Sequence, residues 1–232
     1  MKKTASLDTK TPASSAQIAS ALSLAIHEHR IAPGTKLGED ELGEIYGVSR
    51  TVVRSALQSL SYIQLVEIHR NRGAFVARPS PKEATEVFEA RELLEPRTAR
   101  TAAQFATEAD IALLERHIKD EHVALDASDL GRALYLSGLF HMEIARIANQ
   151  STIAAMIETL VARSSLIIAL YWRRESALCE KHAHHALVRA LAQGNGAQAE
   201  ELMRSHLVDL HSALDLRQQV GNFGSLKDAL RL

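Results

Sequence analysis

The spacing of hydrophobic positions divides the chain into two parts. The N-terminal part shows both helical spacing and strand-like alternation, whereas the C-terminal part shows helical spacing alone. In the N-terminal part, apolar residues recur at helical spacing over 15–30, 39–46 and 49–61. They alternate with polar residues over Leu65–His69 and return over Ala74–Ala77, which is the period of a hairpin. In the C-terminal part every apolar pattern is helical. The sequence therefore predicts a mainly α protein, with a small helix-and-hairpin unit before an all-α bundle.

The third short helix has the features of a helix that reads DNA. Ser49 is a good N-cap, because its hydroxyl can accept an unpaired N–H of the first turn. Apolar side chains form one face, and Thr51 and Arg54 lie on the other, with Arg50 at its N-terminal flank. Arginine binds guanine edges or phosphate, and threonine or serine reaches phosphate or base. A buried face behind a short polar and cationic face is therefore what a helix in the major groove of duplex DNA needs.

A short turn and a cationic hairpin complete the pattern. Gly47-Val48-Ser49 joins the two helices, and Arg70–Gly73 forms the tip of the hairpin, where Gly73 supplies a permissive backbone. Arg72 at this tip suits a phosphate or minor-groove contact. An ordinary three-helix fragment with a solvated basic face is the alternative. The turn, the paired arginines and the basic tip agree in order and distance, which favours a winged helix-turn-helix.

Charge is distributed unevenly between the two parts. The whole chain has a formal net charge of −1. Residues 1–81 hold ten Lys and Arg against seven Asp and Glu, a net charge of +3, and the remainder has a net charge of −4. Between Val48 and Arg78 there are five arginines and one glutamate. The positive field is confined to the predicted DNA-binding unit, so the protein is not a general DNA-coating protein.

Chain-wide features indicate a reducing, aqueous compartment. A single cysteine, Cys179, excludes an internal disulfide framework. No apolar run follows the N-terminal lysines, so no signal peptide is expected. The longest apolar stretch, Leu166–Trp172, is too short to span a bilayer. We expect a cytoplasmic protein with no membrane partner.

Proline, glycine and capping residues predict the domain boundaries. The winged unit is expected over residues 1–79, of which 1–13 form a loose tail. Pro79 ends the hairpin, and Ser80 with Glu83 forms a capping box that starts the bundle. The bundle is expected over residues 80–219 as about six or seven antiparallel helices. A C-terminal tail, 220–232, follows.

Three histidines of the bundle sit in apolar helical patterns that face inward. They are His141, His184 and His206, each on a different predicted helix. Imidazoles from three helices of one bundle can converge on a divalent metal such as Zn²⁺ or Ni²⁺. Each histidine by itself also fits a hydrogen-bonded residue of the core. Residue patterns alone leave both interpretations open.

The motifs of the N-terminal part resemble a known family. PGTKL, GVSRTVVRSALQSL and RNRGAFV are similar to the DNA-binding domain of the GntR transcriptional regulators. The resemblance implies operator contacts by Ser49, Arg50, Thr51, Arg54, Arg72 and Gly73. One departure is visible, because some members carry a backbone-contacting arginine where this chain has Asp40.

The C-terminal part resembles the FCD-type domain of the FadR branch of that family. Arg91, Glu95 and the segments FHMEIARIANQ, HHALVRALAQGN and AELMRSHL carry the resemblance. Many such domains hold a metal with an Asp and three His, and bind a small carboxylate beside it. The three histidines match, but the usual aspartate position, four residues before His141, holds Ser137. Three imidazoles can still hold the metal and leave a position for water or the effector, which we favour. Alternatively, they donate hydrogen bonds to an anionic effector.

Arg91 is a candidate effector-binding residue, because a cation in a mostly apolar bundle attracts an organic acid. A surface ion pair with Glu95, four residues later, is the alternative.

These patterns together predict a homodimeric, effector-responsive regulator that binds double-stranded operator DNA, and by resemblance a repressor. Two other classes remain as alternatives. One is a metal-dependent hydrolase with a DNA-binding head, and the other is a constitutive DNA-binding protein without an effector. The sequence contains no nucleophile elbow and no phosphate-binding glycine loop, which disfavours an enzyme.

Overall fold

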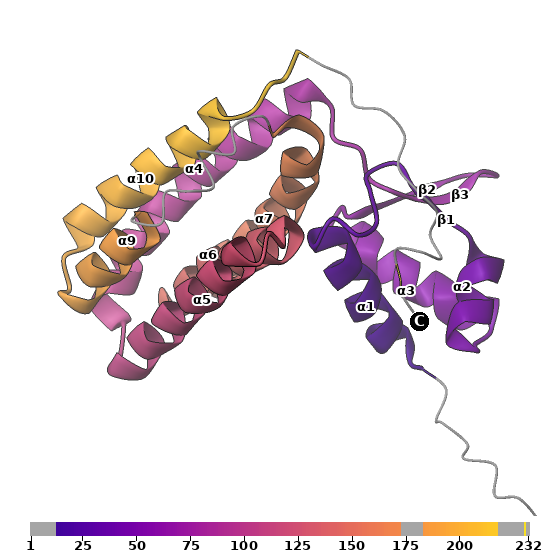
Figure 1. Cartoon of the computed structure of the whole chain (residues 1–232), viewed down its shortest axis with the longest axis horizontal. Helices are drawn as coiled ribbons and strands as arrows, with labels where there is room; N and C mark the ends of the chain where they lie inside the picture. The colour runs from indigo at the N-terminus through magenta and orange to yellow at the C-terminus, as the bar shows by residue number, and fades with distance from the viewer. Residues whose placement is uncertain (1–12, 173–182, 218–229, 231–232) are drawn as a thin grey trace, which may run out of the picture.

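The computed structural model describes residues 13–172, 183–217 and 230. Within them the chain forms a winged-helix unit, α1 to β3, and a helical bundle, α4 to α10, which lie side by side (Figure 1). Cys179 and nearly all of both predicted tails lie outside the described residues. The elements of the winged-helix unit are α1 Ser15–His27, β1 Lys36–Leu37, α2 Glu39–Tyr46, α3 Arg50–Tyr62, β2 Val66–His69 and β3 Gly73–Val76. The elements of the bundle are α4 Pro81–Phe105, α5 Glu108–Asp126, α6 Leu130–Ile147, α7 Ser151–Tyr171, α9 Ala183–Ala192 and α10 Gly196–Ser212.

The winged-helix unit forms as its hydrophobic pattern predicts. The apolar face of α3 is fully buried, and Gly47 ends α2 in the left-handed conformation with φ of 64°. The sheet is antiparallel in the order β1-β3-β2. The third strand, β1, was not predicted, because two residues are too short to show alternation.

One detail of the α3 cap corrects the sequence analysis. Ser49 is the N-cap residue, but within the described part of the chain its hydroxyl accepts no N–H of the first turn. Ser49 is exposed, so its hydroxyl remains accessible from outside the molecule.

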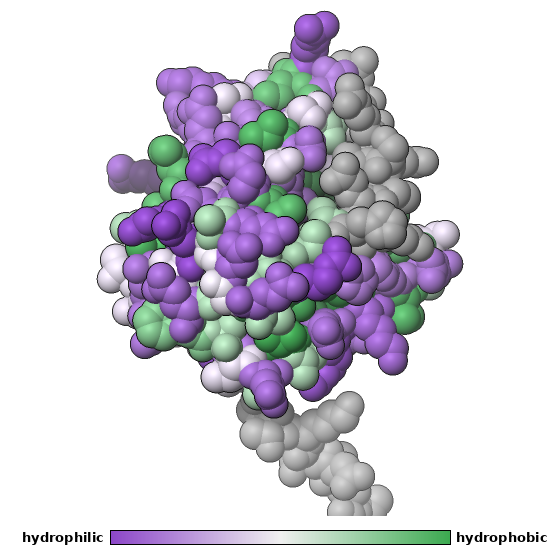
Figure 2. All heavy atoms as spheres, turned by 90° about the vertical axis from the view of Figure 1, so that its left-hand side faces the viewer, coloured by the Kyte–Doolittle hydropathy of each residue, from purple (hydrophilic) through white to green (hydrophobic). Residues whose placement is uncertain are grey.

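The bundle is built around α4, and its six described helices confirm the mainly α fold. The helix starts at the predicted capping box, in which Ser80 and Glu83 bond reciprocally, and it continues through Pro96. It packs against α10, α7 and α6. At the end of the bundle remote from the winged-helix unit, hydrophilic side chains surround separate apolar areas (Figure 2), as expected of helices that bury one face.

Helix α7 packs against both the bundle and the winged-helix unit. By length and composition alone it could cross a membrane, which corrects the expectation drawn from its longest apolar run. Its apolar side chains instead enter three hydrophobic clusters, and Ala162 and Leu166 share one of these with Ile18 and Leu22 of α1. In this structure α7 is therefore a core helix that contacts both units.

Candidate functional site

The three histidines singled out in the sequence meet inside the bundle. His141 lies on α6, His184 on α9 and His206 on α10. The Nε2 atom of His206 lies 3.2 Å from Nε2 of His184 and 3.3 Å from Nε2 of His141. His141 and His184 are buried and His206 is partly buried. Three helices that are separate in sequence thus bring three imidazole nitrogens to one point.

Two buried carboxylates hold the outer nitrogens of two of these rings. Nδ1 of His141 lies 2.6 Å from Oε2 of Glu95, and Nδ1 of His184 lies 3.0 Å from Oε2 of Glu121. A carboxylate accepts from Nδ1–H, which leaves a lone pair on Nε2 directed at the shared centre. Carboxylate–histidine pairs of this kind orient metal ligands in proteins.

The spacing of the Nε2 atoms fits a tetrahedral metal. Zinc–nitrogen bonds of about 2.0–2.1 Å place neighbouring donors of a tetrahedron about 3.3 Å apart. Among the described residues, the three histidines alone form a group whose ligand atoms all lie within 4.8 Å. Ser137 lines the adjoining cavity at the position where the resembled family has aspartate. The donor set therefore suits Zn²⁺ or Ni²⁺ with a coordination position left for an exogenous ligand.

The electrostatics of the site favour neutral side chains for His141 and His206 beside an ionised Glu95. Burial and the two neighbouring histidines lower the pKa of His206 well below its usual 6.5. Burial also lowers the pKa of His141, although Glu95 opposes this effect. Burial alone would raise the pKa of Glu95, but Arg91 and His141 outweigh it and hold the pKa at about 2. Neutral imidazole is the form that binds a metal.

Arg91 forms the predicted pair with Glu95, but the pair is buried rather than on the surface. Its Nε donates to Oε1 of Glu95 at 2.5 Å, and both side chains are less than 5% exposed. The guanidinium also lies 5.6 Å from the ring centre of Phe88. Arg91 lines the same cavity as the histidines. The surface ion pair offered by the sequence is therefore corrected to a buried one, and effector binding by Arg91 stays a prediction.

A cavity of about 70 Å³ adjoins the histidine cluster. It is lined by apolar side chains and by at least as many polar ones from several helices, including Ser137 and Glu121. A space of this size holds on the order of five waters. The cavity therefore suits a small polar molecule beside the histidines.

Sequence reasoning missed several residues of this site, of which Glu121 and His27 matter most here. Glu121 stands in the apolar stripe of α5 after Leu114 and Ile118, and a carboxylate in such a stripe was the available signal. His27 reaches the cavity from α1 of the winged-helix unit. No helical period could identify His27, because its contact depends on how the two units pack.

Glu121 offers a test of the metal fit. Replacing Glu121 with alanine is expected to lower zinc affinity about 10- to 100-fold, because His184 loses the acceptor that orients its ring. Competition with a zinc-binding dye measures this affinity. Asp120→Ala removes the neighbouring exposed acid and should change it little. Equal affinities for Glu121→Ala and wild type would contradict the orienting role.

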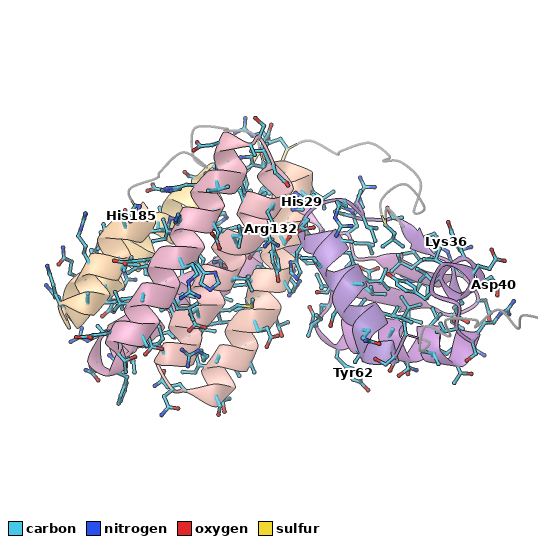
Figure 3. All side chains as sticks on the ribbon, turned by 60° about the horizontal axis from the view of Figure 1, so that its bottom comes forward. His29, Lys36, Asp40, Tyr62, Arg132 and His185 are labelled. Carbon is cyan, nitrogen blue, oxygen red and sulfur yellow. The ribbon has the colours of Figure 1, made fainter. Side chains whose placement is uncertain are left out.

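The predicted DNA-contact residues lie on the surface of the winged-helix unit. All six are exposed: Ser49, Arg50, Thr51, Arg54, Arg72 and Gly73. Gly73 has φ of 92°, which favours glycine at the hairpin tip. Lys36 and Asp40 lie at the end of this unit away from the bundle (Figure 3).

Acidic residues of α2 pair with the two arginines of α3. Arg54 donates from Nη2 to Oε2 of Glu39 at 2.8 Å and from Nε to Oε1 at 3.1 Å. Arg50 pairs with Asp40. Both pairs are solvent-exposed and contribute little stability, so phosphate or a base edge can replace the carboxylates. Asp40 thus orients a cationic side chain at the position where some relatives carry their own cation.

Two family models match the chain. The model described as "Bacterial regulatory proteins, gntR family" matches residues 14–76, and the "FCD domain" model matches residues 86–209, more than half of the chain. The chain belongs to the GntR family of bacterial transcriptional regulators.

Individual relatives align with most of this regulator. The HTH-type transcriptional regulator LutR of Bacillus subtilis is 27% identical over 213 residues, covering 82% of this chain and 95% of LutR. The HTH-type transcriptional repressor RspR of Escherichia coli is 28% identical over 193 residues, covering 82% and 84%. Both relatives are named as transcriptional regulators.

Solved structures share the fold of this regulator. A GntR regulator from Rhodococcus sp. RHA1 aligns with a TM-score of 0.72 at 23% identity, covering 85% of this chain and 95% of that one. E. coli McbR/YncC aligns with the same TM-score at 20% identity, covering 85% and 97%. At these identities the likeness concerns the fold alone.

Proposed function

We propose that this GntR-family regulator is a repressor whose affinity for its operator is set by a small carboxylate bound beside a metal in the bundle. The observation that carries this proposal is the convergence of three Nε2 atoms, two of them on rings held by buried carboxylates. His141, His184 and His206 are the proposed metal ligands. When bound, Zn²⁺ or Ni²⁺ supplies a positive charge that attracts a carboxylate oxygen to the remaining position.

The charges around the cavity support binding of the metal ion before the carboxylate effector. With the histidines counted as neutral, which is the form that binds a metal, Arg91 and Glu95 cancel and Glu121 leaves one formal negative charge. That charge attracts a divalent cation and disfavours an organic anion in its absence. With the cation bound the formal charge is positive, and a monocarboxylate would neutralise it. Arg91 and Ser137 line the cavity and are the proposed effector contacts.

The operator side of the proposal rests on the exposed residues of α3 and the wing. Ser49, Arg50, Thr51 and Arg54 are proposed to enter the major groove, and Arg72 with Gly73 to contact the flanking backbone. In this division the DNA-binding domain spans residues 1–79. The domain that binds the effector and forms the dimer spans residues 80–219, and a tail follows at 220–232. A homodimer would bind two half-sites, and a change in the spacing of its two DNA-binding units would change operator affinity.

Named relatives support the remaining parts of the proposal. RspR is named as a repressor, which favours repression here. LutR and RspR are named as regulators, which favours a non-enzymatic protein of the bacterial cytoplasm.

Arg54 tests the assignment of the DNA-reading surface. Arg54→Ala is expected to weaken binding to an operator selected from random duplexes about 10- to 100-fold at fixed salt, because one arginine contact is lost. Fluorescence anisotropy measures the affinity. Arg116→Ala, which removes an exposed arginine of α5, is the matched control and should leave it unchanged. An unchanged affinity for Arg54→Ala would show that α3 is not the recognition helix.

A further inference from the structure

The C-terminal end of α1 is fastened to the bundle by polar contacts. Nε2 of His29 lies 2.9 Å from the carbonyl oxygen of Ser165 on α7, and the Ser165 hydroxyl donates to the carbonyl of His27 at 3.3 Å. Arg132 of α6 donates to Glu28 at 3.2 Å. His29 and Arg132 lie at the junction of the two units (Figure 3). The winged-helix unit is therefore docked at a defined place.

Gly131 of α6 allows a close approach to the backbone of Glu28 after α1. A Cβ atom built on Gly131, in the first turn of α6, would lie 2.0 Å from the carbonyl oxygen of Glu28. Real side chains do not tolerate such a distance from backbone, so one of the two segments would have to move. Ala162 and Leu166 of α7 also share an apolar cluster with α1. Backbone contact and apolar packing thus fix α1 against α6 and α7.

The same end of α1 forms part of the cavity wall. His27 lines the cavity together with Tyr135 of α6, and their ring centres are 6.0 Å apart. Ser164 and Ser165 of α7 line it as well. Burial, with a smaller effect of His29, lowers the pKa of His27 to about 4. The imidazole is therefore neutral near pH 7 and offers one donor and one acceptor.

We propose that His27 is an effector-recognition residue supplied by the DNA-binding unit, so that a carboxylate with a second polar group binds fully only while α1 is docked. The inference rests on the proposed function, in which the carboxylate occupies the metal end of the cavity. The second group, a hydroxyl or carbonyl, contacts His27 at the other wall. Occupancy of the cavity then fixes the position of the DNA-binding unit. By linkage, the docked arrangement strengthens effector binding by the same factor.

The test uses the full chain loaded with Zn²⁺ and the substitution Gly131→Ala. The added methyl group displaces α1, while every side chain that lines the cavity stays the same. Acetate, glycolate and malate are titrated by calorimetry. Glycolate or malate is expected to bind wild type and to lose about tenfold or more in affinity for Gly131→Ala. Acetate lacks a group that reaches His27, so its affinity should be the same for both proteins.

Matched variants separate docking from general damage. Leu130→Ala alters a partly exposed residue of the same turn and should leave all affinities unchanged. His27→Leu keeps the volume but removes the polar atoms, so it should reproduce the loss for glycolate or malate. If Gly131→Ala does not fold, His27→Leu by itself tests whether His27 recognises the effector. Amide hydrogen exchange of residues 27–31 should slow when glycolate or malate binds wild type.

Two contrary outcomes are distinguishable. If glycolate or malate binds wild type and both substituted proteins equally, the recognition role of His27 is overturned and the proposed function stands. If none of the three carboxylates binds the zinc-loaded wild type, the proposed function is overturned and this inference with it.

Discussion

Replacing His184 with alanine is expected to reduce the zinc or nickel content of the purified, untagged protein from about one ion per chain to almost none. His184 supplies one of three nitrogens at the proposed site, and two imidazoles hold such an ion weakly. Wild type should also gain about 2.7 kcal/mol of stability when free zinc is 100-fold above its Kd. The substituted protein should lose this gain. Elemental mass spectrometry and thermal unfolding measure the two effects.

The adjacent histidine provides a matched control for this experiment. His185 is exposed, packs edge-on against His122 and does not belong to the three-histidine group. His185→Ala should therefore keep the full metal content. If wild type and His184→Ala both contain no metal after purification with zinc present, the three-histidine metal site is wrong. The cavity would then bind its effector through hydrogen bonds alone.

Replacing Glu95 with leucine is expected to lower the free energy of unfolding by about 3–5 kcal/mol. Glu95 is almost completely buried and accepts hydrogen bonds from Arg91 and His141. Its loss leaves the Arg91 guanidinium buried without its carboxylate, and uncompensated buried charge is the main cost. Urea unfolding of the metal-free protein measures the difference and keeps metal binding out of the comparison.

The pH dependence of the free energy of unfolding tests the ionised state of Glu95. The pKa of Glu95 is about 2 in the folded protein against a usual 4.5. Its contribution is therefore fully present above pH 4.5 and is lost as the pH falls from 4.5 towards 2. Glu95→Leu should be less stable than wild type at neutral pH, and the difference should shrink across that window. A constant difference would contradict the charged state assigned to Glu95.

Two further variants separate the ion pair from other effects of substitution. Glu89→Ala removes an exposed acid from the same helix and should change stability by less than about 0.5 kcal/mol. The double variant Arg91→Leu with Glu95→Leu should recover part of the loss, because no charged partner is left alone. A double variant as unstable as Glu95→Leu would show that the lost bond to His141, rather than Arg91, dominates.

Local sequence was sufficient to predict the winged-helix unit. The face of α3, the turn at Gly47 and the hairpin tip at Gly73 each depend on residues within a few positions of one another. Their backbone preferences and periods are therefore visible in the sequence. Strand β1 was missed because it exists only through pairing with β3.

The sequence also determined which residues of the bundle face inward, but not which of them meet. Helical period placed His141, His184 and His206 on apolar faces and identified Arg91 with Glu95 as a pair. It could not predict the 3.2 and 3.3 Å contacts of the histidines, because these depend on how α6, α9 and α10 pack. The hydrophobic period of a helical segment determines which side of the helix is buried, but it does not determine which other helix packs against that side.

Tertiary structure alone decided the composition of the cavity and its connection to the DNA-binding unit. Glu121 reaches His184 from another helix, and His27 reaches the cavity from another unit. Burial of the Arg91–Glu95 pair likewise follows from the helices around α4 rather than from the four-residue spacing. The sequence thus determined the class of the protein through local motifs. Packing between distant segments decided the site, because long-range contacts leave no period in the sequence.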